Sequence, residues 1–181
     1  MTDTILFLTP SVDDYHTTED TFLALGTAFT QTLGPRTSLV RFGRGDAVLD
    51  SALSWAVIDL SNRPYSVTNI DFRREMTGEP STENVAHGLE SFAQVAGVTV
   101  HVGCTYESTD HRKAESTFKA LAMAVRTACE RRTAGEVGAG DVVSTKGVVK
   151  LDVFEQFDGL LDSRLLIDLL HAYVVFEVLL W

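Results

Sequence analysis

Residues 110–124, DHRKAESTFKALAMA, repeat without a gap the pattern of residues 14–28, DYHTTEDTFLALGTA. Seven of the 15 aligned positions are identical, including an Asp, a Glu five residues later and a Phe three residues after the Glu. Two ordinary amphipathic helices can share Phe, Leu and Ala through their buried faces, but burial does not explain the recurring acids. The repeat therefore predicts a duplicated strand–helix unit with polar residues at the start of each helix.

The sequence around these two segments alternates between helical and strand patterns. Apolar residues at helical spacing predict helices at 17–33, 81–96 and 114–129. Short β-branched or aromatic runs predict strands at 39–42, 54–60, 65–72 and 98–104, with turns at 43–46 and 62–64. We expect an α/β fold of two layers, with the helices packed on one face of a mostly antiparallel sheet.

The composition excludes several classes of protein. With 181 residues, 45% of them hydrophobic, the chain can bury the core of one ordinary domain. Its net charge of -10 and isoelectric point near 4.8 argue against a general binder of nucleic acid or anionic membranes. Cys104 and Cys129 fit no zinc spacing, so we expect free thiols and a cytoplasmic location. Residues 165–181 are apolar but contain acids, which favours a buried or partner-seeking helix over a membrane span.

Histidines and glutamates recur at spacings that suit a divalent metal. His111 and Glu115 stand four residues apart, and His16 and Glu19 stand three apart, so each pair shares one face of a helix. His101 alternates with buried-type valines and should point to the other face of its strand. Taken singly, each histidine is better explained as a solvated or core residue. Together, the three histidines and two glutamates are compatible either with a metal site or with an ordinary polar surface.

Six sequence blocks follow one another along the chain: DDYHTTEDTFLALG at 13–26, RFG at 41–43, DLSNRPY at 59–65, LESFAQVAGVTVHV at 89–102, DHRKAESTFKALAMAVR at 110–126 and STKG at 144–147. In order and spacing these blocks resemble the imidazoleglycerol-phosphate dehydratase family, closest to its fungal forms. The resemblance implies a hydro-lyase of histidine biosynthesis that converts imidazole glycerol phosphate to imidazole acetol phosphate. It also implies two manganese ions per site and a large homo-oligomer whose sites are shared between subunits.

The resemblance also implies roles for particular residues. The positions implied as metal ligands are His16, Glu19, His101, His111 and Glu115. Either Glu could carry a proton, so Glu19 and Glu115 are the catalytic candidates. The positions implied for substrate and phosphate binding are Arg41, Arg63, Ser144, Thr145 and Lys146, whose donors suit a phosphate dianion.

Departures from the family pattern leave two functions open. Tyr15 and Arg112 stand where the family carries histidines, so two ligand positions are lost. Residues 1–11 replace a longer family segment, so we expect an incomplete first half before a family domain at 12–149 and an unrelated apolar helical tail at 150–181. The chain is therefore either a dehydratase or a ligand-depleted, non-catalytic member that serves as a scaffold or a substrate- or metal-binding subunit.

Overall fold

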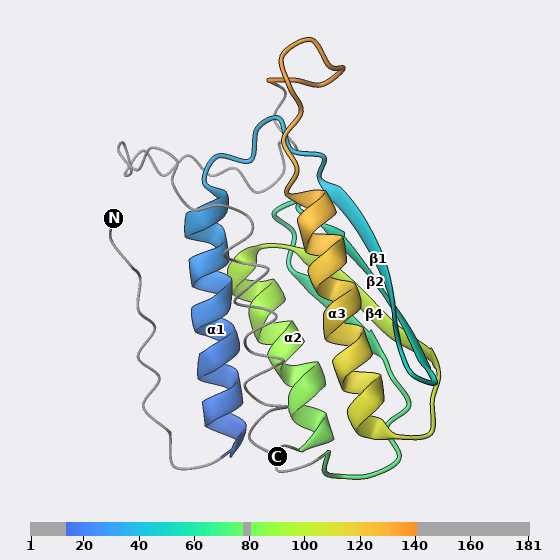
Figure 1. The fold of residues 1–181 in the computed structure, drawn as a ribbon. Coiled ribbons are helices and arrows are strands. Elements are labelled where there is room, and N and C mark those ends of the chain that lie inside the picture. The colour runs from blue at the N-terminus through green and yellow to red at the C-terminus, as the bar shows by residue number, and fades with distance from the viewer. Residues whose placement is uncertain (1–13, 78–80, 141–181) are drawn as a thin grey trace, which may run out of the picture.

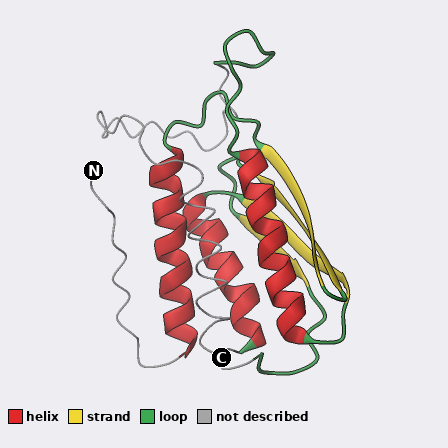
Figure 2. Cartoon of the chain, in the orientation of Figure 1, coloured by secondary structure: helices red, strands yellow, loops and turns green. Residues whose placement is uncertain are grey.

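Three helices and four strands form the fold in a computed structural model that describes residues 14–77 and 81–140. In chain order they are α1 (Asp14–Leu33), β1 (Phe42–Leu49), β2 (Ala52–Asp59), β3 (Tyr65–Asn69), α2 (Thr82–Ala96), β4 (Thr99–Tyr106) and α3 (Asp110–Ala128). The helices lie together on one side of the sheet, as Figure 1 and Figure 2 show. This arrangement confirms the expected two-layer α/β fold.

The sheet has the strand order β1-β2-β4-β3. β1 pairs antiparallel with β2, and β2 pairs antiparallel with β4, whereas β3 runs parallel to β4. Parallel neighbours need a crossover connection, and α2 provides it between β3 and β4. The sheet is therefore mostly antiparallel, as the sequence predicts.

Residues 43–46, predicted as a turn, lie instead inside β1, so that prediction is wrong. A Cβ atom on Gly43 would lie 1.8 Å from the carbonyl oxygen of Ala124, and one on Gly45 would lie 2.1 Å from that of Ala120. Glycine at these two positions lets the backbone of α3 lie directly on β1. The glycines thus serve close packing between a strand and a helix, which a single sequence does not distinguish from a turn.

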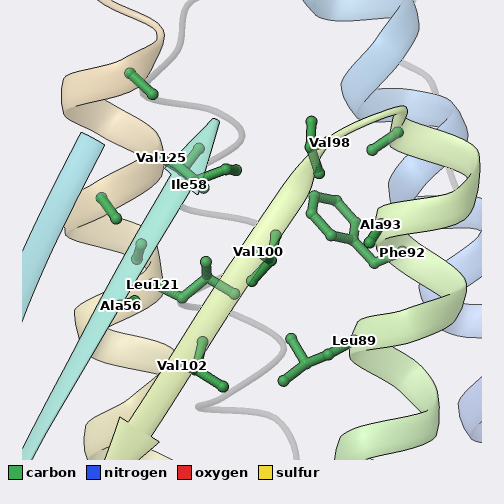
Figure 3. Close-up of a cluster of buried hydrophobic side chains, with 14 of the residues drawn as sticks. Ala56, Ile58, Leu89, Phe92, Ala93, Val98, Val100, Val102, Leu121 and Val125 are labelled. Carbon is green, nitrogen blue, oxygen red and sulfur yellow. The ribbon is translucent and has the colours of Figure 1, made fainter. Parts of the chain in front are cut away.

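The core lies between the sheet and the helices (Figure 3). Val100 and Val102 alternate with exposed His101 along β4, and both valines are fully buried. Leu89 of α2 and Leu121 of α3 pack into the same cluster. Each such side chain contributes about 1.5–3 kcal/mol through burial, so this cluster holds both helices on the sheet.

The first turns of α1, α2 and α3 lie at one end of the helical layer (Figure 1). α1 and α3 begin at Asp14 and Asp110, three or four residues before the predicted starts, so the polar residues of the repeat belong to the first turns. α2 ends at Ala96 and is capped by Gly97, whose left-handed backbone (φ 60°) agrees with the predicted stop. The fold therefore gathers the starts of the repeated helices at one end.

Several predictions concern residues outside the described part of the chain. They are the leader at 1–11, the phosphate-binding positions Ser144, Thr145 and Lys146, and the tail at 150–181. Among the helices in the described ranges, none is both long and apolar enough to cross a membrane.

Candidate functional site

One polar cluster joins the starts of α1 and α2. The Nε2 atom of His87 lies 3.4 Å from Oε1 of Glu19. The ring of Tyr15 stacks on the ring of His87, with centroids 4.5 Å apart and planes 20° apart, and meets the ring of His16 edge-on. His87 Nε2 is buried and makes no hydrogen bond to a described residue, and a carboxylate oxygen of Glu19 faces it.

A second cluster lies on the first two turns of α3. Nε2 of His111 is 3.6 Å from Oε2 of Glu115, the contact that their spacing predicts. The other carboxylate oxygen of Glu115 accepts a hydrogen bond from Nζ of Lys119 at 2.7 Å. The ammonium thus holds one oxygen of Glu115, while the second oxygen faces the imidazole.

The donors of each cluster suit a divalent transition metal. Imidazole nitrogen and carboxylate oxygen bind such ions at about 2.0–2.2 Å, which places adjacent ligand atoms roughly 3–3.5 Å apart. The pairs Glu19–His87 and His111–Glu115 have separations close to that range. Within residues 14–77 and 81–140, however, no three His, Cys, Asp or Glu side chains gather closely enough to hold a metal. Each pair therefore offers two ligands and needs more from elsewhere.

His87 is a candidate ligand that the sequence reasoning missed. Local spacing does not reveal it, because its partner Glu19 lies 68 positions earlier in the sequence. One signal was present, since His87 lies near the start of a helix, as His16 and His111 do. The contact itself arises only when α1 packs against α2.

His101 is exposed on β4, on the sheet face away from the helices. Its neighbours in the sheet are Val57 and Val67. Its outward direction agrees with the predicted strand alternation. The structure does not bring His101 to either helix pair within one chain, so its metal-binding role remains a prediction.

The two residues at lost ligand positions have other partners. Tyr15 covers the ring of His87, and its hydroxyl lies 3.5 Å from Nδ1 of that histidine. Arg112 extends toward the turn between β1 and β2, where its Nε lies 3.4 Å from a carboxylate oxygen of Asp50. Arg112 also donates to the hydroxyl of Ser51. Neither residue supplies a neutral nitrogen donor in place of histidine.

Arg41 and Arg63 lie at the opposite end of the sheet from the helix starts. Arg41 makes a two-point contact with Asp59, through Nε at 2.7 Å and Nη2 at 3.2 Å, and this bonding raises the pKa of the guanidinium. Arg63 is exposed, and its carbonyl accepts a hydrogen bond from Thr99. The eight residues of β2 separate the two ends by roughly 25 Å at about 3.3 Å per residue.

Comparisons with known proteins point to one family. The family model described as imidazoleglycerol-phosphate dehydratase matches residues 9–125. The chain is 51% identical over 138 residues to the imidazoleglycerol-phosphate dehydratase of Lachancea kluyveri, covering 76% of this chain and 57% of that protein. It is 50% identical to the one from Saccharomyces cerevisiae, covering 76% of this chain and 60% of the yeast protein. The chain thus spans about three fifths of the length of these relatives.

Two solved structures share the fold. The imidazoleglycerol-phosphate dehydratase of Staphylococcus aureus subsp. aureus N315 is 28% identical and superposes with a TM-score of 0.63, covering 68% of this chain and 72% of that one. The imidazoleglycerol-phosphate dehydratase of Pyrococcus furiosus in complex with (S)-C348 is 27% identical with a TM-score of 0.59, covering 72% of this chain and 73% of that one. The similarity therefore extends from sequence to backbone arrangement.

Proposed function

Because this chain belongs to the imidazoleglycerol-phosphate dehydratase family, we propose that it acts in histidine biosynthesis as a hydro-lyase, converting imidazole glycerol phosphate to imidazole acetol phosphate. The observation that carries this proposal is the pairing of imidazole and carboxylate at two helix starts, Glu19 with His87 and His111 with Glu115. A cytoplasmic location is part of the proposal.

The proposed cofactor is manganese, held in part by the two pairs. When bound, the ion would stabilise the imidazolate-like charge that develops on the substrate. Dehydration also requires removal of a carbon-bound proton and departure of a hydroxyl group. Glu19 and Glu115 are the proposed proton carriers, because each carboxylate is partly buried and lies beside an imidazole.

Phosphate binding is proposed for Arg41 and Arg63, with Ser144, Thr145 and Lys146 as further candidates. Asp59 orients the guanidinium of Arg41 at its end of the sheet. Imidazole glycerol phosphate is about 10 Å long, judged from bond lengths near 1.5 Å. It cannot span the roughly 25 Å between the arginines and the helix starts of one chain. This separation supports a homo-oligomer in which different copies contribute the metal pairs and the phosphate-binding residues.

The second candidate function is a non-catalytic scaffold or binding subunit. It is favoured by Tyr15, which stacks on His87, and by Arg112, whose permanent charge is directed to Asp50. In this alternative the chain keeps the family fold and the arginines proposed to bind substrate, but it does not convert substrate to product.

Metal analysis of the purified full chain, combined with an assay for imidazole acetol phosphate, separates the two functions. The dehydratase proposal expects bound manganese and product, with both reduced in His87→Gln and retained in the control Glu83→Gln, which alters an exposed residue of α2. His101→Gln tests whether the strand histidine donates across a subunit boundary. Absence of both metal and product would favour the scaffold, and Tyr15→His with Arg112→His should then raise the manganese content.

A further inference from the structure

The two aspartates that begin the repeated helices, Asp14 and Asp110, hold opposite ends of the same connection. This connection runs from the end of β3 to the start of α2, and its described parts are residues 70–77 and Ser81. The aspartates occupy matched positions in the repeat, 96 residues apart. Asp14 and Asp110, which are equivalent in the repeat, thus both bond to the same connection, and this connection lies outside the two repeated segments.

Asp110 holds the β3 side of the connection. Both of its oxygens accept from the backbone N–H of Arg73 at 3.1 Å, and Oδ2 also accepts from the N–H of Arg74 at 2.9 Å. Nζ of Lys113 donates to Oδ1 at 2.9 Å and also contacts the carbonyl of Asp71. Both side chains of the ion pair are only 4% exposed. Burial acts to raise the pKa of Asp110, but these donors outweigh it, so its pKa lies below the ordinary value.

Asp14 holds the α2 side through a single oxygen. Its Oδ2 accepts from the backbone N–H of Ser81 at 3.0 Å and from Nδ2 of Asn84 at 2.7 Å. Asn84 is buried on α2, one turn before His87. The Asp14–Asn84 bond therefore fixes the start of α1 against the start of α2, beside Tyr15 and one turn of α2 before His87.

We propose that Asp14 and Asp110 are paired positioning residues, which fix the connection across the helix starts and thereby set the Glu19–His87 and His111–Glu115 pairs. The part of this inference that concerns metal rests on the proposed function. The part that concerns the arrangement of side chains does not.

The geometry predicts different effects when each aspartate is replaced by asparagine. Because both donors reach one oxygen of Asp14, an asparagine carbonyl at that position can accept both hydrogen bonds. Both oxygens of Asp110 are occupied by donors, so an amide NH₂ there would face a donor. Asp14→Asn should therefore retain the arrangement, whereas Asp14→Ala and Asp110→Asn should lose it.

The test uses the full chain without metal and then with Mn²⁺ alone. In Asp14→Ala, the NOE between the rings of Tyr15 and His87 should weaken, and amide exchange at Ser81 should rise about 10-fold or more. The affinity for Mn²⁺, measured from the EPR signal of the free ion, should fall at least about 10-fold. Asp14→Asn should restore all three properties, and Asp20→Ala, an exposed acid of the same helix, should change none of them.

Asp110→Asn should raise amide exchange at Arg73 and Arg74 and weaken Mn²⁺ binding; if this variant does not fold, the Asp14 series decides. An unchanged ring NOE in Asp14→Ala, or equal losses in Asp14→Ala and Asp14→Asn, would overturn the proposal. If the ring NOE is lost but Mn²⁺ affinity is unchanged, the aspartates are structural only and the proposal fails. A wild-type chain that binds no Mn²⁺ refutes the metal part of the proposed function, and the NOE and exchange results then decide the positioning role.

Discussion

Replacing Gly43 by alanine should separate β1 from α3. The added Cβ atom would lie 1.8 Å from the carbonyl oxygen of Ala124, 2.8 Å from its carbonyl carbon and 2.9 Å from the backbone nitrogen of Ala128. These atoms belong to a helix backbone, so no side chain can rotate to relieve the overlap. Either the strand or the helix must move.

The size of the movement sets the expected cost. An ordinary contact begins at 3.4 Å, which is 1.6 Å beyond the 1.8 Å separation. Overpacking a core costs about 1–3 kcal/mol when side chains can adjust, and rigid backbone on both sides places this substitution at the upper end. We expect Gly43→Ala to lower the free energy of unfolding by about 3 kcal/mol.

Urea denaturation followed by circular dichroism measures this loss. Gly34→Ala is the matched control, because its Cβ would meet nothing within 4 Å and only the positive φ of 56° opposes it. That control should cost about 1 kcal/mol. A loss in Gly43→Ala no larger than in Gly34→Ala would refute the packing role assigned to β1.

Three further measurements test the core and two titrating groups. Leu89→Ala should cost about 3–5 kcal/mol in urea unfolding, because the side chain is fully buried and its removal leaves a cavity. Hydrogen bonds from the hydroxyl of Ser51 and from nearby backbone N–H groups lower the pKa of Glu107 to about 2 from an ordinary 4.5. The contribution of Glu107 to stability is therefore complete above pH 4.5 and is lost as the pH falls toward 2. Glu107→Gln should flatten that part of the pH profile of the urea midpoint. Burial raises the pKa of Cys129 to about 11, so at pH 8 a Cys104→Ser variant should react with a disulfide reagent about 100-fold more slowly than free cysteine, and a rate near that of free cysteine would contradict this.

Much of the fold could be predicted from local pattern. The predicted helix at 81–96 and the strands at 54–60 and 98–104 agree with α2, β2 and β4 to within two residues. Hydrophobic period distinguishes helix from strand wherever one face is buried, and these elements each bury one face. The same rule placed His101 on the exposed face of β4. The i,i+4 contact of His111 with Glu115 followed from helical geometry alone.

Other features depended on packing between distant segments. Glycines at 43 and 45 suggested a turn, because a sequence does not show that α3 lies against the strand. His87 had no visible role until α2 placed it beside Glu19.

The sequence by itself determined most of the element types, the repeat and the family, because these depend on residue order and local period. Only the tertiary structure decided that Asp14 and Asp110 hold one connection, that His87 joins Glu19, and that the arginines lie at the far end of the sheet. The physical reason is that hydrogen bonds and ligand pairs form between atoms a few ångströms apart, and packing of helices and strands alone decides which distant residues approach so closely.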